Sequence, residues 1–254
     1  MQLTILGCGT SSGVPRIGND WGACDPSEPR NRRRRVSILV EHRDTRILVD
    51  TSPDLREQLL DAGVADVDAV IWTHDHADHC HGIDDLRQLF HARGAPIPGF
   101  ARAATLDTLR QRFAYAFEGK GGYPPVVDGH LLPDAFSVGD IALRITDQPH
   151  GDIVSAGIRF DVGGKSIGYS TDVNILTDDM IDLFKDVDVW VVDALREPPH
   201  PTHPHLDQAL EWIDIVKPGR ALLTHMDNSM DYAALRASLP AGVEPAYDGL
   251  EVVL

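Results

Sequence analysis

Short apolar runs, each bounded by polar or turn-forming residues, dominate the first third of the chain. Runs of this length and composition are typical of strands buried in a sheet. They predict strands over residues 1–6, 36–41, 46–50 and 68–73. Further along, apolar residues recur at helical spacing and predict helices over 82–92 and 104–118.

The second half of the chain alternates strands with helices. We expect strands over 136–146, 156–161, 165–170, 187–192 and 219–224, and helices over 176–185 and 206–216. The segment Val162-Gly-Gly-Lys165 has the composition of a hairpin turn. This alternation predicts a mixed α/β fold with more than one sheet. No linker or low-complexity segment divides the chain, so we expect a single domain over 1–254.

Four side chains that can bind metal lie within six residues, between the fourth predicted strand and the next helix: His74, His76, Asp78 and His79. Imidazole and carboxylate both bind divalent transition ions. Side chains of an extended segment repeat with a period of two, so His74 and His76 can face one ion. Asp78 and His79 follow where the chain turns and can face a second ion. The run predicts a dinuclear hydrolytic site rather than a polar loop that is rich in histidine by chance.

Five further polar residues stand at or just beyond the ends of predicted strands: Asp50, His150, Asp172, Asp193 and His225. In open α/β sheets, ligands bind in the crevice outside the carboxyl ends of the strands. Any one of these residues could simply cap a helix or a turn. As a set, we expect them to converge on the site that the His74 run opens.

Composition and charge set limits on partners and location. The chain is 43% hydrophobic and 24% charged, and no apolar run is long enough to cross a membrane. Its first residues lack the basic region and cleavage site of a signal peptide. The three cysteines are widely spaced and form no disulfide framework, which suits a reducing cytoplasm. A formal net charge of -16 opposes binding to nucleic acid and favours a small substrate.

The basic residues gather at one place, where Arg30 and Arg32 to Arg35 precede the second predicted strand. Most such runs are solvated surfaces, and we expect that of at least three of the five. One or two could bind a phosphate, because guanidinium matches phosphate oxygens with two hydrogen bonds.

The order and spacing of His74, His76, Asp78 and His79 resemble the signature of the metallo-β-lactamase fold superfamily. The resemblance extends over nearly the whole chain, from Gly7-Cys-Gly-Thr-Ser-Ser-Gly13 to His225. It implies a four-layer αβ/βα sandwich with two divalent ions, zinc or manganese before iron. It also implies two sets of ligands, one for each ion: His74, His76 and His150, and Asp78, His79 and His225. Asp172 would bridge the two ions, and Asp50 would orient a ligand without binding metal itself.

Within the superfamily, Gly9-Thr-Ser-Ser-Gly-Val-Pro15 and Arg112-Phe-Ala-Tyr-Ala-Phe117 resemble the branch that opens phosphoribosyl 1,2-cyclic phosphate. The segment from Asp193 to Trp212 is also similar to the related tRNA 3′-processing nucleases. The resemblance implies a general acid at His203, with His205 as the second choice and His200 as a third histidine nearby. His205 and Arg196 would contact the substrate. The branch carries a Cys-rich structural zinc loop, whereas here only Cys24 remains, so we expect no structural zinc.

These features predict a metal-dependent phosphodiesterase acting on a small phosphodiester, with cyclic phosphodiesters among the candidate substrates. Two alternatives stay open: a lactonase or thioesterase on the same scaffold, and a metal-bearing binding protein without turnover. The segment 93–135, with Phe113, Tyr115 and Phe117, is expected to form a pocket wall or lid. Its aromatic side chains could equally serve the core. The oligomeric state stays open, with a homodimer among the candidates.

Overall fold

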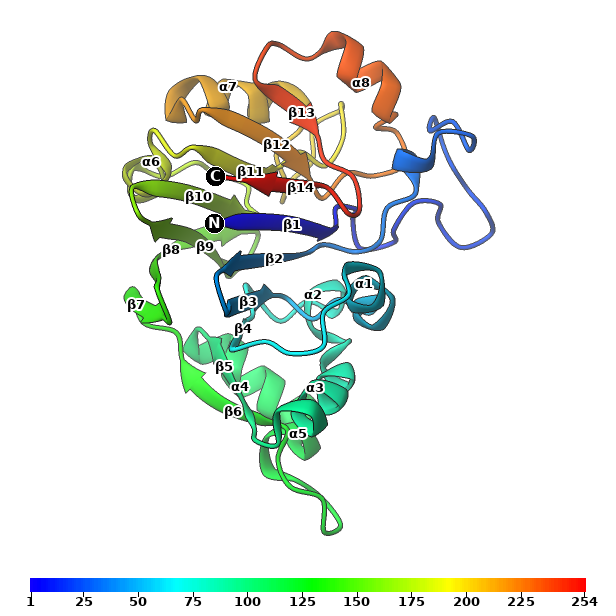
Figure 1. Cartoon of the computed structure of the whole chain (residues 1–254). Helices are drawn as coiled ribbons and strands as arrows, with labels where there is room; N and C mark the ends of the chain where they lie inside the picture. Colours follow the sequence, from blue (N-terminus) through cyan, green and yellow to red (C-terminus); the bar gives the residue numbers. More distant parts are fainter.

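Two seven-stranded sheets form the centre of the molecule in the computed structural model, which describes residues 1–254 (Figure 1). The first sheet pairs antiparallel strands at the β14 edge and parallel strands from β3 to β6. Its strands, in spatial order, are β14 (Glu251–Val253), β1 (Gln2–Gly7), β2 (Ser37–His42), β3 (Thr45–Val49), β4 (Ala69–Ile71), β5 (Ile97–Ala101) and β6 (Val127–Leu131).

The second sheet is also mixed, with parallel pairing from β10 to β13 and antiparallel pairing from β7 to β10. Its strands, in spatial order, are β13 (Val243–Pro245), β12 (Arg220–Thr224), β11 (Val189–Asp193), β10 (Lys165–Ser170), β9 (Ile153–Val162), β8 (Ile141–His150) and β7 (Ala135–Val138).

Helices cover the outer faces of both sheets, which gives the four layers expected from the sequence (Figure 1). Those beside the first sheet are α1 (Leu55–Ala62), α2 (Ala77–Cys80), α3 (Leu86–Arg93), α4 (Ala103–Arg112) and α5 (Ala114–Glu118), with 3-10 turns at Pro29–Asn31 and Ile83–Asp85. Those beside the second sheet are α6 (Asp178–Phe184), α7 (Leu206–Val216) and α8 (Tyr232–Ser238).

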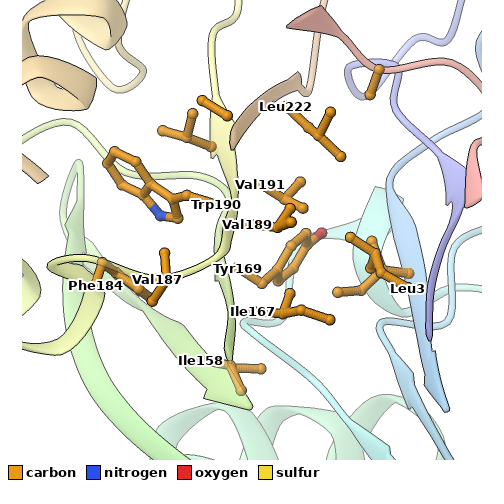
Figure 2. Close-up of a cluster of buried hydrophobic side chains, with 14 of the residues drawn as sticks. Leu3, Ile158, Ile167, Tyr169, Phe184, Val187, Val189, Trp190, Val191 and Leu222 are labelled. Atoms are coloured by element: carbon orange, nitrogen blue, oxygen red, sulfur yellow. The ribbon is translucent and has the colours of Figure 1, made fainter. Parts of the chain in front are cut away.

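Central strands are apolar on both faces because each face meets another layer. In β2, Ile38 belongs to the core between the sheets, whereas Leu39 belongs to the cluster under the first set of helices. Figure 2 shows the same alternation in β11, where Trp190 lies beside Phe184 of α6 while Val191 points to the opposite side. Burying each such side chain contributes about 1.5–3 kcal/mol, so these strands fix the sheets as rigid supports for the loops at their ends.

Two elements expected from the sequence are divided in the structure. The strand expected over 136–146 is the hairpin of β7 and β8, turned at Gly139, whose φ of 53° favours glycine. The helix expected over 104–118 breaks at Phe113, which leaves helical geometry between α4 and α5. The turn at Val162-Gly-Gly-Lys165 is confirmed as the β9–β10 hairpin.

None of the helices combines the length and apolarity needed to span a bilayer. The three cysteines are buried and unpaired.

Candidate metal centre

The His74 run crosses from a buried strand into a short helix. His74 lies three residues after β4, His76 directly precedes α2, and Asp78 and His79 lie within α2. Backbone bonds hold this helix against the loop after β3: the Thr51 N–H donates to the His79 carbonyl, and the Gly82 N–H donates to the Thr51 carbonyl. A Cβ on Gly82 would overlap the Ser52 carbonyl oxygen, so glycine permits this close approach.

The strand-end residues reach the same place from other parts of the chain. His150 ends β8, and Asp50, Asp172 and His225 each follow a strand within two residues. Asp50, Asp172 and His225 have φ values of 63°, 53° and 57°, in the left-handed region that non-glycine residues rarely adopt. Such conformations cost about 1–3 kcal/mol each and cluster at functional sites, where surrounding structure enforces them.

Asp172 lies between two groups of imidazoles, with one carboxylate oxygen facing each group. Its Oδ1 is 3.8 Å from His74 Nε2 and 3.5 Å from His150 Nε2. Its Oδ2 is 3.1 Å from His79 Nε2 and 3.5 Å from His225 Nε2. The carboxylate of Asp78 completes the second group, with Oδ2 at 3.5 Å from both His79 Nε2 and His225 Nε2. The centre therefore has two halves that share one aspartate.

The unsatisfied nitrogen atoms of the centre fit bound metal. The Nε2 atoms of His74, His79 and His225 are buried and have no hydrogen-bond partner. Leaving such atoms unpaired is costly unless a ligand satisfies them. Potential ligand atoms within 4.8 Å of one another form two such groups: His74, His76, His150 and Asp172, and Asp78, His79 and His225. A third group joins Asp172 and His225 to His203. Histidine and carboxylate together suit zinc and manganese.

Burial and neighbouring charges of both signs shift the pKa values of the side chains at this centre. Burial lowers the pKa of His74 well below its usual value, and the neighbouring His79 adds to that effect. Burial acts to raise the pKa of Asp172, but the imidazoles of His225 and His79 outweigh it and hold that pKa well below its usual range. Burial acts to lower the pKa of His225, yet Asp172 and Asp78 raise it to about 9. Because imidazole must be deprotonated at the nitrogen that binds metal, metal affinity at this centre should depend on pH.

Three of the imidazoles are held from behind through Nδ1. His79 Nδ1 lies 2.7 Å from Asp50 Oδ2, and His150 Nδ1 lies 3.0 Å from the carbonyl oxygen of Thr202. His203 Nδ1 lies 2.8 Å from Asp193 Oδ2. A hydrogen bond at Nδ1 selects the tautomer whose Nε2 lone pair is free, and so aims Nε2 into the centre.

Sequence reasoning missed part of this outer layer. Thr73 donates to Asp50 through its backbone N–H at 2.8 Å and through its hydroxyl at 2.8 Å, which fixes the carboxylate that holds His79. The only feature of the sequence that could have pointed to Thr73 is that it directly precedes the ligand His74. Asp193 lies beside the ligands, as expected of the strand-end residues: its Oδ2 contacts His203 Nδ1 and accepts from the Asp172 N–H, although Asp193 belongs to none of the ligand groups.

Of the three histidines in the 200–205 loop, His203 contacts the ligand side chains of the centre. The ring of His203 stacks on that of His225, with centroids 4.7 Å apart and an interplanar angle of 11°, and its Nε2 is 3.9 Å from Asp172 Oδ1. His200 lies beside His203, at 5.2 Å between ring centroids. His205 directly precedes α7 and is not among the rings stacked at the centre. Arg196 donates to the carbonyl oxygens of Pro198 and Pro199, within its own loop.

The arginine run differs from the solvated surface expected of it. Arg33 is buried and donates to the carbonyl oxygens of Asp227 and Met230, just after His225. Arg34 and Arg35 are half-buried and pair with acidic residues, so only Arg30 and Arg32 are largely exposed. Arg33 therefore ties the first loop to the segment that follows β12, while Arg34 and Arg35 tie it to the region of α1.

A cavity of about 600 Å³ opens beside His76, and its other lining residues are Asp75, Ala77, His81, Arg112 and Phe113. Arg112 and Phe113 belong to the segment expected to form a pocket wall. The aromatic residues of that segment also pack against the second core cluster.

A family model described as a β-lactamase superfamily domain matches residues 45–226. Over 264 aligned residues the chain is 32% identical to a protein named "Octanoyltransferase" from Porphyromonas gingivalis, covering all of this chain and 52% of that protein. It is 34% identical over 135 residues to a "Ribonuclease Z" from Methanopyrus kandleri, covering 48% of this chain and 43% of the relative. The chain spans about half the length of the curated relatives it matches.

Among solved structures, the chain is similar to one described as a new diphosphatase from the PhnP family. The TM-score is 0.91 at 35% sequence identity, and the match covers 99% of this chain and 96% of the other. The two proteins are similar in sequence as well as in fold, because the identity of 35% holds over almost the full length of both chains.

Proposed function

Because the chain belongs to the β-lactamase superfamily, we propose that its centre holds two divalent metal ions and hydrolyses a small phosphodiester. The main support is the position of Asp172, whose two carboxylate oxygens face two separate sets of imidazoles. A single structural ion has no need of a shared carboxylate between two half-sites. This arrangement favours a dinuclear centre over a binding protein with one closed ion.

The two halves of the centre would each hold one ion. His74, His76 and His150 form one set, Asp78, His79 and His225 form the other, and Asp172 is common to both. When bound, two such ions supply positive charge for the phosphate oxygens and lower the pKa of water toward neutrality. Asp50 keeps Nε2 of His79 directed at the centre, and the Thr202 carbonyl does the same for His150.

His203 is the proposed general acid. Its Nε2 lies 3.9 Å from Asp172 Oδ1, at the edge of the centre, while its Nδ1 is already bonded to Asp193. A proton on Nε2 can therefore pass to an oxygen that leaves phosphorus beside Asp172. General acid help of this kind contributes about 10²–10⁴-fold to a rate. His205 lacks a comparable position, so the geometry favours His203 over the second choice.

Attack at phosphorus fits the relatives better than attack at a carbonyl. Two of the proteins similar to this chain are named for reactions that cleave bonds to phosphorus, a diphosphatase and a ribonuclease. The "Octanoyltransferase" is named for acyl transfer, but this chain matches only about half of it. Acyl transfer through a thiol would need a reactive cysteine, whereas burial raises the pKa of Cys80 to about 12. The net charge of -16 argues against RNA as the natural substrate.

A diphosphate is a second candidate substrate, favoured by the 35% identity to the PhnP-family diphosphatase. The two candidates differ in what leaves phosphorus. A phosphate group leaves as a stable anion, whereas a sugar hydroxyl must be protonated as it departs. Loss of His203 should therefore slow cleavage of an alkyl phosphodiester far more than cleavage of a diphosphate.

The test pairs elemental analysis with a substrate panel. Purified protein should contain two equivalents of zinc or manganese and should hydrolyse bis-p-nitrophenyl phosphate and 2′,3′-cyclic nucleotides in preference to simple lactones. Asp172→Ala should lose metal and activity together. Adenosine diphosphate in the same panel tests the second candidate. Hydrolysis of lactones without any phosphodiester or diphosphate would contradict the proposal.

A further inference from the structure

We propose that two buried serines, Ser37 and Ser155, are positioning residues for the metal centre. Each donates its hydroxyl proton to the backbone of an aspartate, Ser37 to Asp50 and Ser155 to Asp172. This bond holds the aspartate in the left-handed conformation from which its carboxylate reaches the centre. The inference rests on the proposed function, in which two ions share Asp172 and Asp50 orients the ligand His79.

The two aspartates have the same unusual backbone conformation. Asp50 and Asp172 each follow a strand within two residues, and their φ values are 63° and 53°. The side chain of an L-residue crowds the backbone in this region, so the conformation persists only where surrounding structure enforces it. Glycine would adopt it without strain but carries no carboxylate. An aspartate at either position therefore needs contacts that hold its backbone.

A serine hydroxyl supplies such a contact at both positions. Ser37 Oγ lies 3.0 Å from the carbonyl oxygen of Asp50 and 3.0 Å from that of the residue before it. Ser155 Oγ lies 2.7 Å from the carbonyl oxygen of Asp172 and 3.2 Å from that of the residue before it. Each serine thus fixes two successive carbonyl groups at the point where the chain leaves its strand.

The two serines occupy equivalent places in the two sheets (Figure 1). Ser37 begins β2, the antiparallel neighbour of β3, and Asp50 directly follows β3. Ser155 lies in β9, the antiparallel neighbour of β10, and Asp172 comes just after β10. Both serines are fully buried, so solvent does not compete for their bonds. The same contact therefore occurs once in each sheet, at an aspartate that serves the centre.

Ser155 is held in turn by Gln148, its cross-strand neighbour in β8. Gln148 Nε2 donates to Ser155 Oγ at 3.1 Å and to the Thr171 carbonyl oxygen at 3.2 Å. The Gln148 Oε1 accepts from the hydroxyl of Ser170. A Cβ on Gly157 would lie 2.6 Å from that Oε1, so glycine leaves room for the amide. Because Ser155 Oγ accepts from Gln148, its own proton points to the carbonyl groups after β10.

Support of the core alone is the competing explanation, because a buried polar group that loses its partner costs stability anywhere in a protein. The two roles differ in their effect on metal. Asp172 faces both halves of the centre, so its displacement should weaken the binding of both ions. Asp50 bonds to one ligand, His79, so its displacement should weaken one ion. Loss of core support alone would leave both affinities unchanged in the folded protein.

The experiment measures zinc affinity of Ser37→Ala and Ser155→Ala by competition with a chelator, and the stability of each metal-free variant by urea unfolding. Ser166→Ala is the matched control. The Ser166 hydroxyl is also buried and bonds to Asp188, at the opposite end of β10 from Asp172. Where an alanine variant does not fold, the cysteine variant of the same serine replaces it, because a thiol is a weak donor of similar shape.

We expect Ser155→Ala to lose about 10–100-fold in affinity for both ions, the usual scale for groups that orient metal ligands. Ser37→Ala should lose a similar factor for one ion and bind the other as the wild-type protein does. Ser166→Ala should be less stable than the wild-type protein and still bind both ions with wild-type affinity.

Two results would overturn the positioning role: wild-type affinities in Ser155→Ala, or losses in Ser37→Ala and Ser155→Ala that Ser166→Ala reproduces. Equal weakening of both ions in Ser37→Ala would also contradict it. A wild-type protein that binds fewer than two ions would instead refute the dinuclear centre of the proposed function.

Discussion

Replacing Asp50 with asparagine should weaken one half of the metal centre and spare the other. Oδ1 of Asp50 accepts the Thr73 N–H at 2.8 Å, and Oδ2 accepts from His79 Nδ1 at 2.7 Å. Asparagine has only one acceptor atom. If its oxygen stays with the Thr73 N–H, its NH₂ group faces Nδ1 of His79. The imidazole must then carry its proton on Nε2, and a protonated Nε2 cannot bind metal.

The magnitude follows from the two possible orientations of the amide. With the oxygen on Thr73, loss of the outer carboxylate should reduce affinity for one ion by about 10–100-fold. With the oxygen on His79, the buried Thr73 N–H loses its acceptor, which costs about 1–3 kcal/mol of folding stability. The backbone donor cannot change its tautomer, whereas the imidazole can, so we expect the first outcome. His74, His76 and His150 make no bond to Asp50 and should keep their ion.

Zinc titration in competition with a chelator of known affinity measures both sites. The wild-type protein should bind two ions, and Asp50→Asn should bind one with unchanged affinity and one weakly. Asp61→Asn is the control, because Asp61 is 66% exposed and pairs only with Arg34. Two unchanged affinities in Asp50→Asn would refute the role assigned to the Asp50–His79 pair.

Three other predictions concern separate parts of the molecule. Asp172→Ala should abolish binding of both ions, as measured by metal content after dialysis, and retention of one tightly bound ion would contradict a shared aspartate. Burial raises the pKa of Asp248 to about 7, so the folded protein keeps a proton that the unfolded chain releases near pH 4. This group therefore lowers the free energy of unfolding as pH rises through that interval, and Asp248→Asn should flatten the dependence in urea titrations at pH 5 and 8. Parallel curves for both proteins would count against it. Arg33→Met should destabilise the fold by about 2–4 kcal/mol, because two buried carbonyl groups lose their donor, while Arg30→Met at the exposed end of the run should leave the free energy of unfolding almost unchanged. Equal costs in thermal or urea unfolding would contradict that reasoning.

The regular apolar strands could be predicted from the sequence, whereas the irregular ones could not. β2 and β3 are short, apolar and bounded by turns. β5 was missed because Ile97-Pro-Gly-Phe-Ala101 contains two residues that usually interrupt strands. The structure supplies the reason for its glycine: a Cβ on Gly99 would come within 2.7 Å of the Trp72 ring. Such a contact between distant segments leaves no local signal in the sequence.

In the candidate site, too, residues close together in the sequence could be predicted, whereas contacts between distant segments could not. The spacing of His74 to His79 is local, so the sequence alone predicted a ligand cluster there. Among the partners of Nδ1, Asp50 was expected from the family resemblance. The Thr202 carbonyl and Asp193 were not expected in that role, because each contact depends on how a loop returns to the sheet. Asp193 stood at a strand end among the expected ligands, yet only the path of the 196–205 loop brings His203 to its oxygen. Backbone conformation at Asp172 and His225 is similarly enforced by the surrounding fold.

Each half of the centre draws its side chains from both sheets. His74 and His76 follow a strand of the first sheet and meet His150 from the second, and His79 likewise meets His225. Buried nitrogen atoms without a hydrogen-bond partner, and the left-handed backbone conformations of Asp172 and His225, both cost free energy at this centre. The large apolar core between the sheets must offset that cost. Ions bound there would join the two sheets at their common edge, so metal affinity and folding stability are coupled in this molecule.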